Sequence, residues 1–375
     1  MSMNRTIHTA FLPLLDAAPL IVAADKGFAE AENIDLRLVR ETSWANVRDR
    51  LSVGHFEVAH LLAPLPVAAA LGLSPNDPSV IAPMALGLGG NTVTISSRLA
   101  ARIKRLTHFS GVDAAAAGTA LKTALRGWEK DTGSRPVFAV VHRFSSHNLD
   151  LRYWLSASGI EPDDEVDIVI VSPSLMPSML VEGKIDGFCV GEPWGSAAVA
   201  AGAGHILTSK ASIWRSSPEK VLGVNSELLE REPEVVHGLI RSVYRAAQWC
   251  SDRANGEELV SLLQAPHRLN IPMERLYPAM SGKFHDLNGA PALIEDFYIP
   301  FEKAANFPWQ SHALWFYTQM VRWGLAKWDA ALVEKVEGAY RPDVYRAALA
   351  SLNLDLPAAS SKVEGALMQP ENLAS

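Results

Sequence analysis

An α/β fold made of two similar halves is the architecture that this 375-residue sequence predicts, and two patterns indicate it. Short apolar, strand-like segments alternate with helix-like segments from residue 6 to about residue 190, which is typical of α/β proteins with a mostly parallel sheet. The β-α-β-α-β order of residues 7–62 then returns after residue 92. We therefore expect two lobes, followed from about residue 225 by a mostly helical C-terminal region.

The first half contains five predicted elements. Apolar patterning predicts strands at residues 7–12, 34–39 and 58–62, and helical spacing predicts helices at residues 19–30 and 44–52. Asp16 is placed to cap the first helix, and Thr42 or Ser43 to cap the second.

The same patterns continue through the second half and the C-terminal region. Strands are predicted at residues 93–96, 136–142, 167–171 and 185–190, and helices at residues 114–129, 149–158 and 176–182. Helices are also predicted at residues 233–253, 313–324 and 330–338, and the Ala/Ser-rich tail from Leu356 is expected to fray.

Residues 53–60 and 182–189 share one pattern: a helix end, a glycine, an acidic residue, an apolar strand and then a proline loop. Because ligands of open α/β sheets bind at the carboxyl ends of strands, two such loops would face one cleft. The alternative is a chance repetition.

Composition and motifs exclude several classes of protein. The net charge of −7 and the absence of a Lys/Arg cluster argue against direct nucleic-acid binding, so an anion would have to be held by local donors. The sequence has no GxSxG, Walker, HExxH or CxxC motif, and its 11 histidines lack metal-ligand spacing, so we expect no metal and no cofactor. The glycines of residues 87–90 indicate a tight turn or hinge, since they lack dinucleotide-loop spacing.

The N-terminal residues suggest a location. Residues 1–5 lead directly into a strand-like segment with no apolar signal region, and the apolar stretch of residues 58–73 is broken by Pro64 and Pro66. We therefore expect a cytoplasmic protein without a membrane span; a periplasmic protein whose signal was trimmed is the alternative. Cys189 and Cys250 are interpreted as free thiols, and a disulfide is the alternative.

Ordered motifs along most of the chain resemble one family. They lie at residues 12–20, 41–49, 59–66, 147–148 with 151–155, 188–194, 218–220, 248–250, 311–312 with 315, and 322–324. Over residues 6–350 the sequence resembles the nitrate-binding proteins of ABC importers (NrtA-like) and their relatives, the cytoplasmic nitrate/nitrite sensors called NasS.

The resemblance implies a two-lobed, periplasmic-binding-protein-like (type II) fold without enzymatic activity. It places residues 1–90 plus 222–375 in lobe I and residues 91–221 in lobe II, with a ligand cleft between them. The lobes are expected to hinge at crossings near Gly89 and Val221.

The resemblance also implies an anion site. The family's Trp, His and Lys positions fall on Trp44, His147 and Lys220, and Asn91 takes the place of the family's Gln. Asn is shorter by one methylene, which puts a direct contact from Asn91 in doubt. The family's wall positions match Pro173 and Val190, and Gly191 and Glu192 adjoin them.

These residue types suit a flat monoanion. Lys220 would supply the charge, His147 and Asn91 directional donors, and Trp44 an indole N–H with an apolar wall. Each has an ordinary structural alternative: Trp44 as a core aromatic, His147 as a helix cap and Lys220 as a surface lysine. Glu192 is expected to orient a donor or to bind backbone N–H groups, because a carboxylate repels nitrate.

The resemblance to NasS implies a cytoplasmic sensor of nitrate or nitrite that controls a NasT-type antiterminator partner. Lysine at position 220 favours nitrate or nitrite over bicarbonate, since the bicarbonate-binding branch has a Glu near that position. A subunit of a nitrate ABC importer is the second hypothesis. An enzyme acting on a small anion or a thiamine-precursor-like substrate is the third.

Overall fold

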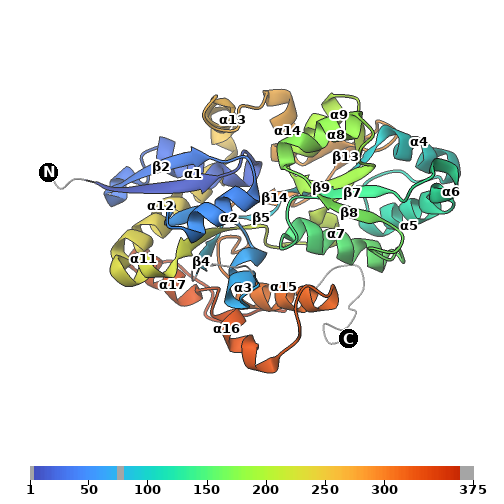
Figure 1. The fold of residues 1–375 in the computed structure, drawn as a ribbon. Helices are drawn as coiled ribbons and strands as arrows, with labels where there is room; N and C mark the ends of the chain where they lie inside the picture. The colour runs from blue at the N-terminus through green and yellow to red at the C-terminus, as the bar shows by residue number, and fades with distance from the viewer. Residues whose placement is uncertain (1–3, 74–79, 364–375) are drawn as a thin grey trace.

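Two five-stranded sheets form the two lobes in a computed structural model, which describes residues 4–73 and 80–363 (Figure 1). The first sheet has the order β2 (Ile34–Arg40), β1 (Arg5–Phe11), β3 (Val58–Leu62), β11 (Lys220–Asn225) and β4 (Val80–Ala85). The second has the order β10 (Gly204–Ser209), β6 (Asn91–Ser96), β9 (Gly187–Gly191), β7 (Val137–Val140) and β8 (Asp167–Ile170).

Four of the five strands in each sheet run in the same direction, so the prediction of mostly parallel sheets is confirmed; β11 and β6 are the reversed strands. Strand β1 is parallel to β2 and β3, whereas β11 is antiparallel to β3 and β4. Strand β7 is parallel to β8 and β9, whereas β6 is antiparallel to β9 and β10. Strands β6 and β11 are reversed because the chain enters each sheet from the other lobe. Each starts at the edge where the lobes meet, whereas the other four strands of its sheet end at that edge.

Lobe I carries helices α1 (Ala18–Asp25), α2 (Trp44–Ser52) and α3 (Pro64–Ala70), with 3-10 turns η1 (Leu15–Ala17) and η2 (Glu30–Glu32). Ser43 caps α2 by accepting the Asn46 N–H at 3.2 Å, as predicted. The helix predicted at residues 19–30 is shorter, because Gly27 has a positive φ and ends it.

Lobe II carries helices on both sides of its sheet. They are α4 (Ser97–Leu106), α5 (Ala114–Leu125), α6 (Trp128–Thr132), α7 (Ser146–Ala157), α8 (Met176–Val181), α9 (Trp194–Ala200) and α10 (Lys210–Ile213), with η3 (Pro173–Leu175). The predicted helix at residues 114–129 is divided into α5 and α6 by Gly127, which adopts a left-handed conformation.

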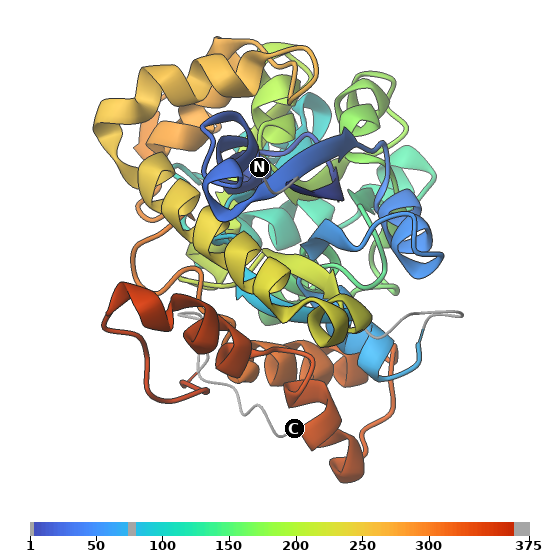
Figure 2. The ribbon, with the colours of Figure 1, turned by 90° about the vertical axis from the view of Figure 1, so that its left-hand side faces the viewer.

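The C-terminal region is mostly helical, as predicted. Its elements are α11 (Ser226–Arg231), α12 (Pro233–Ser251), η4 (Arg253–Asn255), α13 (Gly256–Gln264), α14 (Met273–Ser281), β12 (Lys283–His285), β13 (Pro291–Leu293), β14 (Tyr298–Ile299), α15 (Gln310–Arg322), η5 (Ala330–Leu332), α16 (Val333–Glu337), α17 (Pro342–Leu349) and η6 (Ala350–Leu352). Helix α12 packs on α1 and α17, whereas α15 packs on both α3 of lobe I and α7 of lobe II. In Figure 2, α15 to α17 form the lower layer of the molecule.

The start of the tail is held in place, contrary to the prediction that it frays. The Arg346 guanidinium donates to the carbonyls of Pro357, Ala358 and Ala359 at 2.8–3.0 Å. The rest of the predicted tail, residues 364–375, lies outside the described residues.

The pattern shared by residues 53–60 and 182–189 corresponds to a structural repeat. Gly54 and Gly183 both have positive φ, of 72° and 68°. In each lobe, the backbone carbonyl of the acidic residue after this glycine accepts a hydrogen bond from the last residue of a neighbouring strand. The Asn225 N–H of β11 donates to the Glu57 carbonyl, and the Ser96 N–H of β6 donates to the Asp186 carbonyl. Strand β11 in lobe I therefore corresponds to β6 in lobe II.

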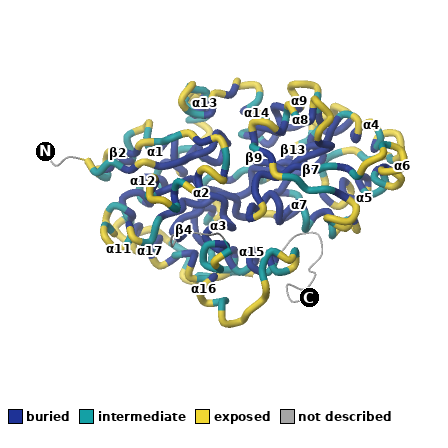
Figure 3. The backbone as a smooth tube through the Cα atoms, in the orientation of Figure 1, coloured by how far each residue is buried: buried dark blue, intermediate teal, exposed yellow. Residues whose placement is uncertain are grey.

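The largest apolar core extends across both lobes, and a second one lies almost entirely within lobe II. The larger apolar cluster runs from β1 to Val190 and Trp194 of lobe II, and Figure 3 shows this buried band through the centre. The glycine-rich residues 87–90 form an extended connection between β4 and β6 rather than the predicted tight turn, although Gly87, Gly89 and Gly90 all have positive φ. A Cβ at Gly89 would lie 2.3 Å from the Phe297 carbonyl oxygen, where β5 (Leu88–Gly89) pairs with β14. Cys189 and Cys250 are free thiols, buried and half-buried respectively.

Candidate functional site

The two crossing strands start at equivalent points of the two sheets. Lys220 of β11 lies opposite Leu62, the last residue of β3, and Asn91 of β6 lies opposite Gly191, the last residue of β9. Lys220 and Asn91 thus occupy corresponding places, at the carboxyl ends of parallel strands where α/β proteins bind ligands.

Lys220 is completely buried, so it is not a surface lysine. Its Nζ donates to Asp16 Oδ2 at 3.0 Å and to Glu219 Oε1 at 2.7 Å. The ammonium also lies 5.2 Å from the centre of the Trp44 ring, within the range of a cation–π contact. Lys220 therefore supplies a formal positive charge at the junction of the lobes.

Trp44 is buried at the first turn of α2, and its ring lies 5.3 Å from the His60 ring. Its indole Nε1 has no hydrogen-bond partner among the described residues. Buried indole N–H groups usually have a partner, so this donor is available to a ligand.

His147 does not cap α7; Ser145 does, by accepting the Asn148 N–H at 3.1 Å. The His147 Nε2 lies 3.1 Å from Glu219 Oε1 and accepts the Gly191 N–H at 3.2 Å. Its Nδ1 is buried and has no partner in the described part of the chain. Burial lowers the pKa of His147 to about 3, although Glu219 opposes this shift.

Glu219 joins the two lobes through both of its carboxylate oxygens. Its side chain is 1% exposed and lies within 3.1 Å of five side chains: Asn91 (2.7 Å), Ser146 (2.5 Å), His147 (3.1 Å), Lys210 (2.6 Å) and Lys220 (2.7 Å). Burial would raise the pKa of Glu219, but its neighbours His147, Lys210 and Lys220 outweigh it and hold that pKa well below its usual range. Glu219 is therefore ionised.

A second buried ion pair lies behind Glu219 in lobe II. Lys210 Nζ is 2.6 Å from Asp150 Oδ2 and also donates to the Pro218 carbonyl at 2.8 Å. Burial would lower the pKa of Lys210, but Asp150 and Glu219 outweigh it and raise that pKa. Burial also raises the pKa of Asp150 to about 6, against the influence of Lys210.

Asp16 does not cap α1, contrary to the prediction. It is buried in η1, and its carboxylate contacts Lys220 and, at 3.0 Å through Oδ1, His60 Nε2. Burial would raise the pKa of Asp16, but Lys220 and His60 outweigh it and lower that pKa. Burial also lowers the pKa of His60, which keeps this ring neutral near pH 7.

Asn91 lies at the site but presents an acceptor. Its Nδ2 donates to Glu219, while its Oδ1 is buried with no partner among the described residues. A Cβ at Gly191 would lie 3.3 Å from this oxygen and 3.2 Å from Leu14, so glycine permits close approach of the two lobes here.

The expected wall residues differ in their placement. Glu192 binds a backbone N–H, that of Ser196 at 3.0 Å, and accepts the Thr92 hydroxyl at 2.9 Å; burial raises the pKa of its carboxyl. Val190 belongs to the core next to the site, and buried Pro173 begins η3 with no contact to the cluster in the described hydrogen bonds and ion pairs.

The two lobes also meet directly outside the charged cluster. The Leu15 N–H of lobe I donates to the Glu192 carbonyl of lobe II at 2.9 Å. At the rim, Arg48 Nη1 lies 3.4 Å from His142 Nε2. These contacts place the charged cluster in the closed interface between the lobes.

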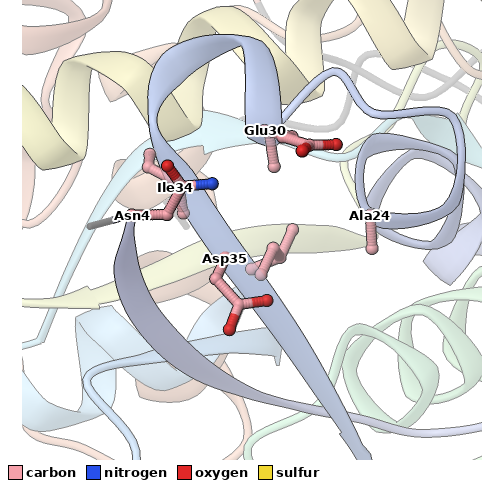
Figure 4. Close-up of a pocket in the computed structure, with 7 residues that line it drawn as sticks. Asn4, Ala24, Glu30, Ile34 and Asp35 are labelled. Carbon is pink, nitrogen blue, oxygen red and sulfur yellow. The ribbon is translucent and has the colours of Figure 1, made fainter. Parts of the chain in front are cut away.

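The pocket in Figure 4 is a separate feature of about 540 Å³ at the edge of lobe I. It lies beside strand β2 and shares no residue with the cluster. Its lining includes Glu30 and Asp35, so its charge does not suit an anion.

Sequence reasoning missed several members of the cluster. Asp16, His60 and Glu219 lie inside motifs on which the family resemblance rests. The sequence therefore drew attention to these positions, but it did not predict that their side chains belong to the site. Lys210 and Asp150 gave no signal, because an isolated lysine or aspartate is usually exposed.

Two classes of feature are not found in the part of the chain that the structure describes. Its His, Cys, Asp and Glu residues form no group of three suited to a metal ion. Across residues 4–73 and 80–363, no helix has the length and apolar character needed to cross a membrane.

Comparisons with known proteins identify relatives of this chain. A model of the NMT1-like family matches residues 2–264. The chain is 31% identical to the nitrate/nitrite binding protein NrtA of Synechococcus elongatus over 388 residues, which cover 98% of this chain and 84% of that protein. It is 33% identical to the nitrate import ATP-binding protein NrtC of Synechocystis over 343 residues, which cover 90% of this chain.

A further relative is the bicarbonate transport ATP-binding protein CmpC of Synechococcus elongatus, with 32% identity over 93% of this chain. The chain spans about half the length of NrtC and CmpC, 49% and 50% respectively.

Solved structures agree with the sequence relatives. The fold matches the crystal structure of the periplasmic nitrate-binding protein NrtA from Synechocystis with a TM-score of 0.89, 25% identity and coverage of 97% of this chain and 94% of that one. The two-lobed, periplasmic-binding-protein-like fold and the resemblance to NrtA are confirmed. A closer kinship to NasS stays a prediction.

Proposed function

Because the chain belongs to the NMT1-like family, we propose that it is a solute-binding protein that holds nitrate or nitrite between its two lobes without turning it over. Its relatives include nitrate-binding proteins, and its buried interface contains an ammonium group beside unpaired donors.

One observation carries this proposal. Lys220 supplies a buried positive charge next to Trp44, and both Trp44 Nε1 and His147 Nδ1 are buried without a partner among the described residues. Unpaired buried polar atoms cost free energy, about 1–3 kcal/mol each, so such atoms commonly mark a ligand position. We propose that the anion accepts from Trp44, His147 and Lys220, with Gly191 and Val190 as wall.

Bicarbonate is the second candidate ligand, because of Asn91. The unpaired Oδ1 of Asn91 is an acceptor, which suits the O–H of bicarbonate and finds no donor on nitrate. The similarity to CmpC supports testing it. Lys220 remains the feature that favours nitrate.

Calorimetric titration with nitrate, nitrite, bicarbonate and sulfate tests the proposal directly. We expect saturable binding of nitrate or nitrite and none of sulfate, whose second negative charge would enter a cluster that already has more carboxylates than ammonium groups. A bicarbonate affinity above that of nitrate would support the second candidate, and no binding of any of the four would refute both.

A pair of tryptophan variants tests the position of the ligand. Trp44→Phe removes the indole N–H and should weaken nitrate binding about tenfold, the equivalent of one hydrogen bond. Trp128→Phe is the matched control, since it removes a buried indole from the distant α6 and should leave affinity unchanged. Equal effects of the two substitutions would contradict the assignment.

Closure of the lobes would report the ligand to another molecule. We propose a cytoplasmic sensor that controls a NasT-type antiterminator; the alternative is a subunit of a nitrate importer, as its relatives' names suggest. Co-precipitation with a NasT-type protein, and its release by nitrate, would support the sensor. Recovery of the protein only from the periplasm would refute it.

The division into residues 1–90 plus 222–375 and residues 91–221 is part of this proposal. Strands β1 to β4 and β11 share one sheet and β6 to β10 the other, which supports it, except that Lys220 and Val221 pair within the sheet of lobe I. Scattering curves that contract on addition of nitrate would support hinge motion between these units.

A further inference from the structure

A chain of alternating charges runs through the buried interface. It consists of Asp150, Lys210, Glu219, Lys220 and Asp16, with neighbouring groups 2.6–3.0 Å apart, and it ends at His60. The cluster therefore contains three carboxylates and two ammonium groups. When all five groups are ionised, it has an excess of one negative charge. Because burial keeps both site histidines neutral, a second negative charge from a ligand would enter an already negative and poorly solvated cluster.

The ring of His147 lies between a donor and an acceptor that compete for one atom. Its Nε2 accepts the Gly191 N–H at 3.2 Å and lies 3.1 Å from Glu219 Oε1. A neutral ring satisfies only one of these contacts, because Nε2 either carries a hydrogen or offers a lone pair. An imidazolium would donate from Nε2 to Glu219 and from Nδ1, which has no partner in the described chain, to a ligand.

We propose that the anion binds together with one proton, which His147 carries as an imidazolium held between Glu219 and the anion. The proton comes from solvent and offsets the charge of the anion, so that the cluster keeps an excess of one negative charge, and the Gly191 N–H becomes free to donate elsewhere. This inference rests on the proposed function, since it describes how the same site accommodates its ligand.

The charged groups around His147 give the direction of the linkage. Burial is the largest influence on its pKa; Glu219 and Asp16 raise that pKa, and Lys220 and Lys210 lower it. Without an anion the pKa is about 3, so the ring is neutral at pH 7. An anion beside Nδ1 raises this pKa, and by reciprocity protonation raises anion affinity. Affinity should therefore rise as pH falls, from the pKa of the complex down towards pH 3.

Calorimetry with nitrate at pH 5, 6 and 7 measures the proton directly. At each pH, two buffers that differ in ionisation enthalpy report how many protons are absorbed, and nitrate itself does not titrate in this range. We expect uptake that approaches one proton per nitrate at pH 5 and an affinity that rises by up to tenfold per pH unit. Circular dichroism checks that the fold persists.

The possible failures are distinguishable. Nitrate binding with no proton uptake between pH 5 and 7 overturns this inference and leaves the proposed function standing. Absence of nitrate binding at every pH overturns both.

Substitution and NMR assign the proton to a residue. His147→Gln keeps a side-chain donor but cannot titrate, so it should bind nitrate with most of the proton uptake and of the pH dependence lost. Asp150, whose pKa is about 6, accounts for any small remainder. His205→Gln, in β10 and outside the cluster, is the control and should retain the uptake. In the unsubstituted protein, the ¹⁵N shifts of the His147 ring should change on addition of nitrate from a neutral to an imidazolium pattern. Undiminished uptake in His147→Gln, or a ring that stays neutral, would overturn the assignment.

Discussion

The two lobes place different chemistry at equivalent positions of their facing edges. In lobe I the crossing strand begins with the charged Lys220, and in lobe II it begins with the neutral Asn91. Both side chains donate to the same carboxylate, that of Glu219. The fold thus repeats the geometry of the edge, whereas the ammonium at this position belongs to lobe I alone. The other ammonium of the cluster, Lys210 of lobe II, lies behind Glu219 and pairs with Asp150.

The largest expected effect comes from removing the charge of lobe I. Lys220→Met leaves Asp16 and Glu219 buried without their shared cation, so the free energy of unfolding should fall by about 3–5 kcal/mol. Nitrate binding should be lost. Chemical denaturation and calorimetry measure the two effects, and Lys184→Met, which breaks only an exposed ion pair with Glu182, is the control. A stability equal to that of the control would mean that Lys220 is not paired as described.

Removing the corresponding group of lobe II should have a smaller effect. Asn91→Ala deletes a buried hydrogen bond to a charged acceptor, which contributes about 1.5–3 kcal/mol, and leaves Glu219 with its remaining partners. The free energy of unfolding from denaturant titration checks this. A loss as large as that of Lys220→Met would erase the proposed difference between the lobes.

The pH dependence of stability sharpens the comparison through His147. Its folded pKa of about 3 lies below the unfolded value of 6.5, so the unfolded chain binds more protons between these limits. Stability contributed by the neutral ring is therefore lost as pH falls below 6.5. Relative to His147→Gln, the unsubstituted protein should lose about 1.4 kcal/mol by pH 5.5 in the absence of anion. Parallel stability curves for the two proteins would contradict this prediction.

The smallest effect is expected at the rim. Arg48 contacts His142 across the lobes, but it is partly exposed and already pairs with Asp49. Arg48→Gln should change nitrate affinity by no more than about threefold, in keeping with the weak contribution of exposed charges. A hundredfold loss would move the site outward, towards the rim.

Local patterns in the sequence were sufficient for much of the fold. Strands β1 and β3, helix α2 with its Ser43 cap and the glycine turns at Gly54 and Gly183 all follow from apolar spacing and turn chemistry. The one reversed strand in each sheet did not follow, because the direction of β6 and β11 depends on which lobe the chain is leaving.

The candidate site residues also fall into two groups, those that the sequence predicted and those that only the structure showed. The amino-acid sequence by itself determined the elements and, through the family resemblance, marked Trp44, His147 and Lys220. Only the tertiary structure decided that Lys220 meets Asp16, 204 residues away along the chain, and that Glu219 collects donors from both lobes. The physical reason is that a buried charge is stable only beside its counter-charge, and folding, rather than spacing along the chain, brings such partners together.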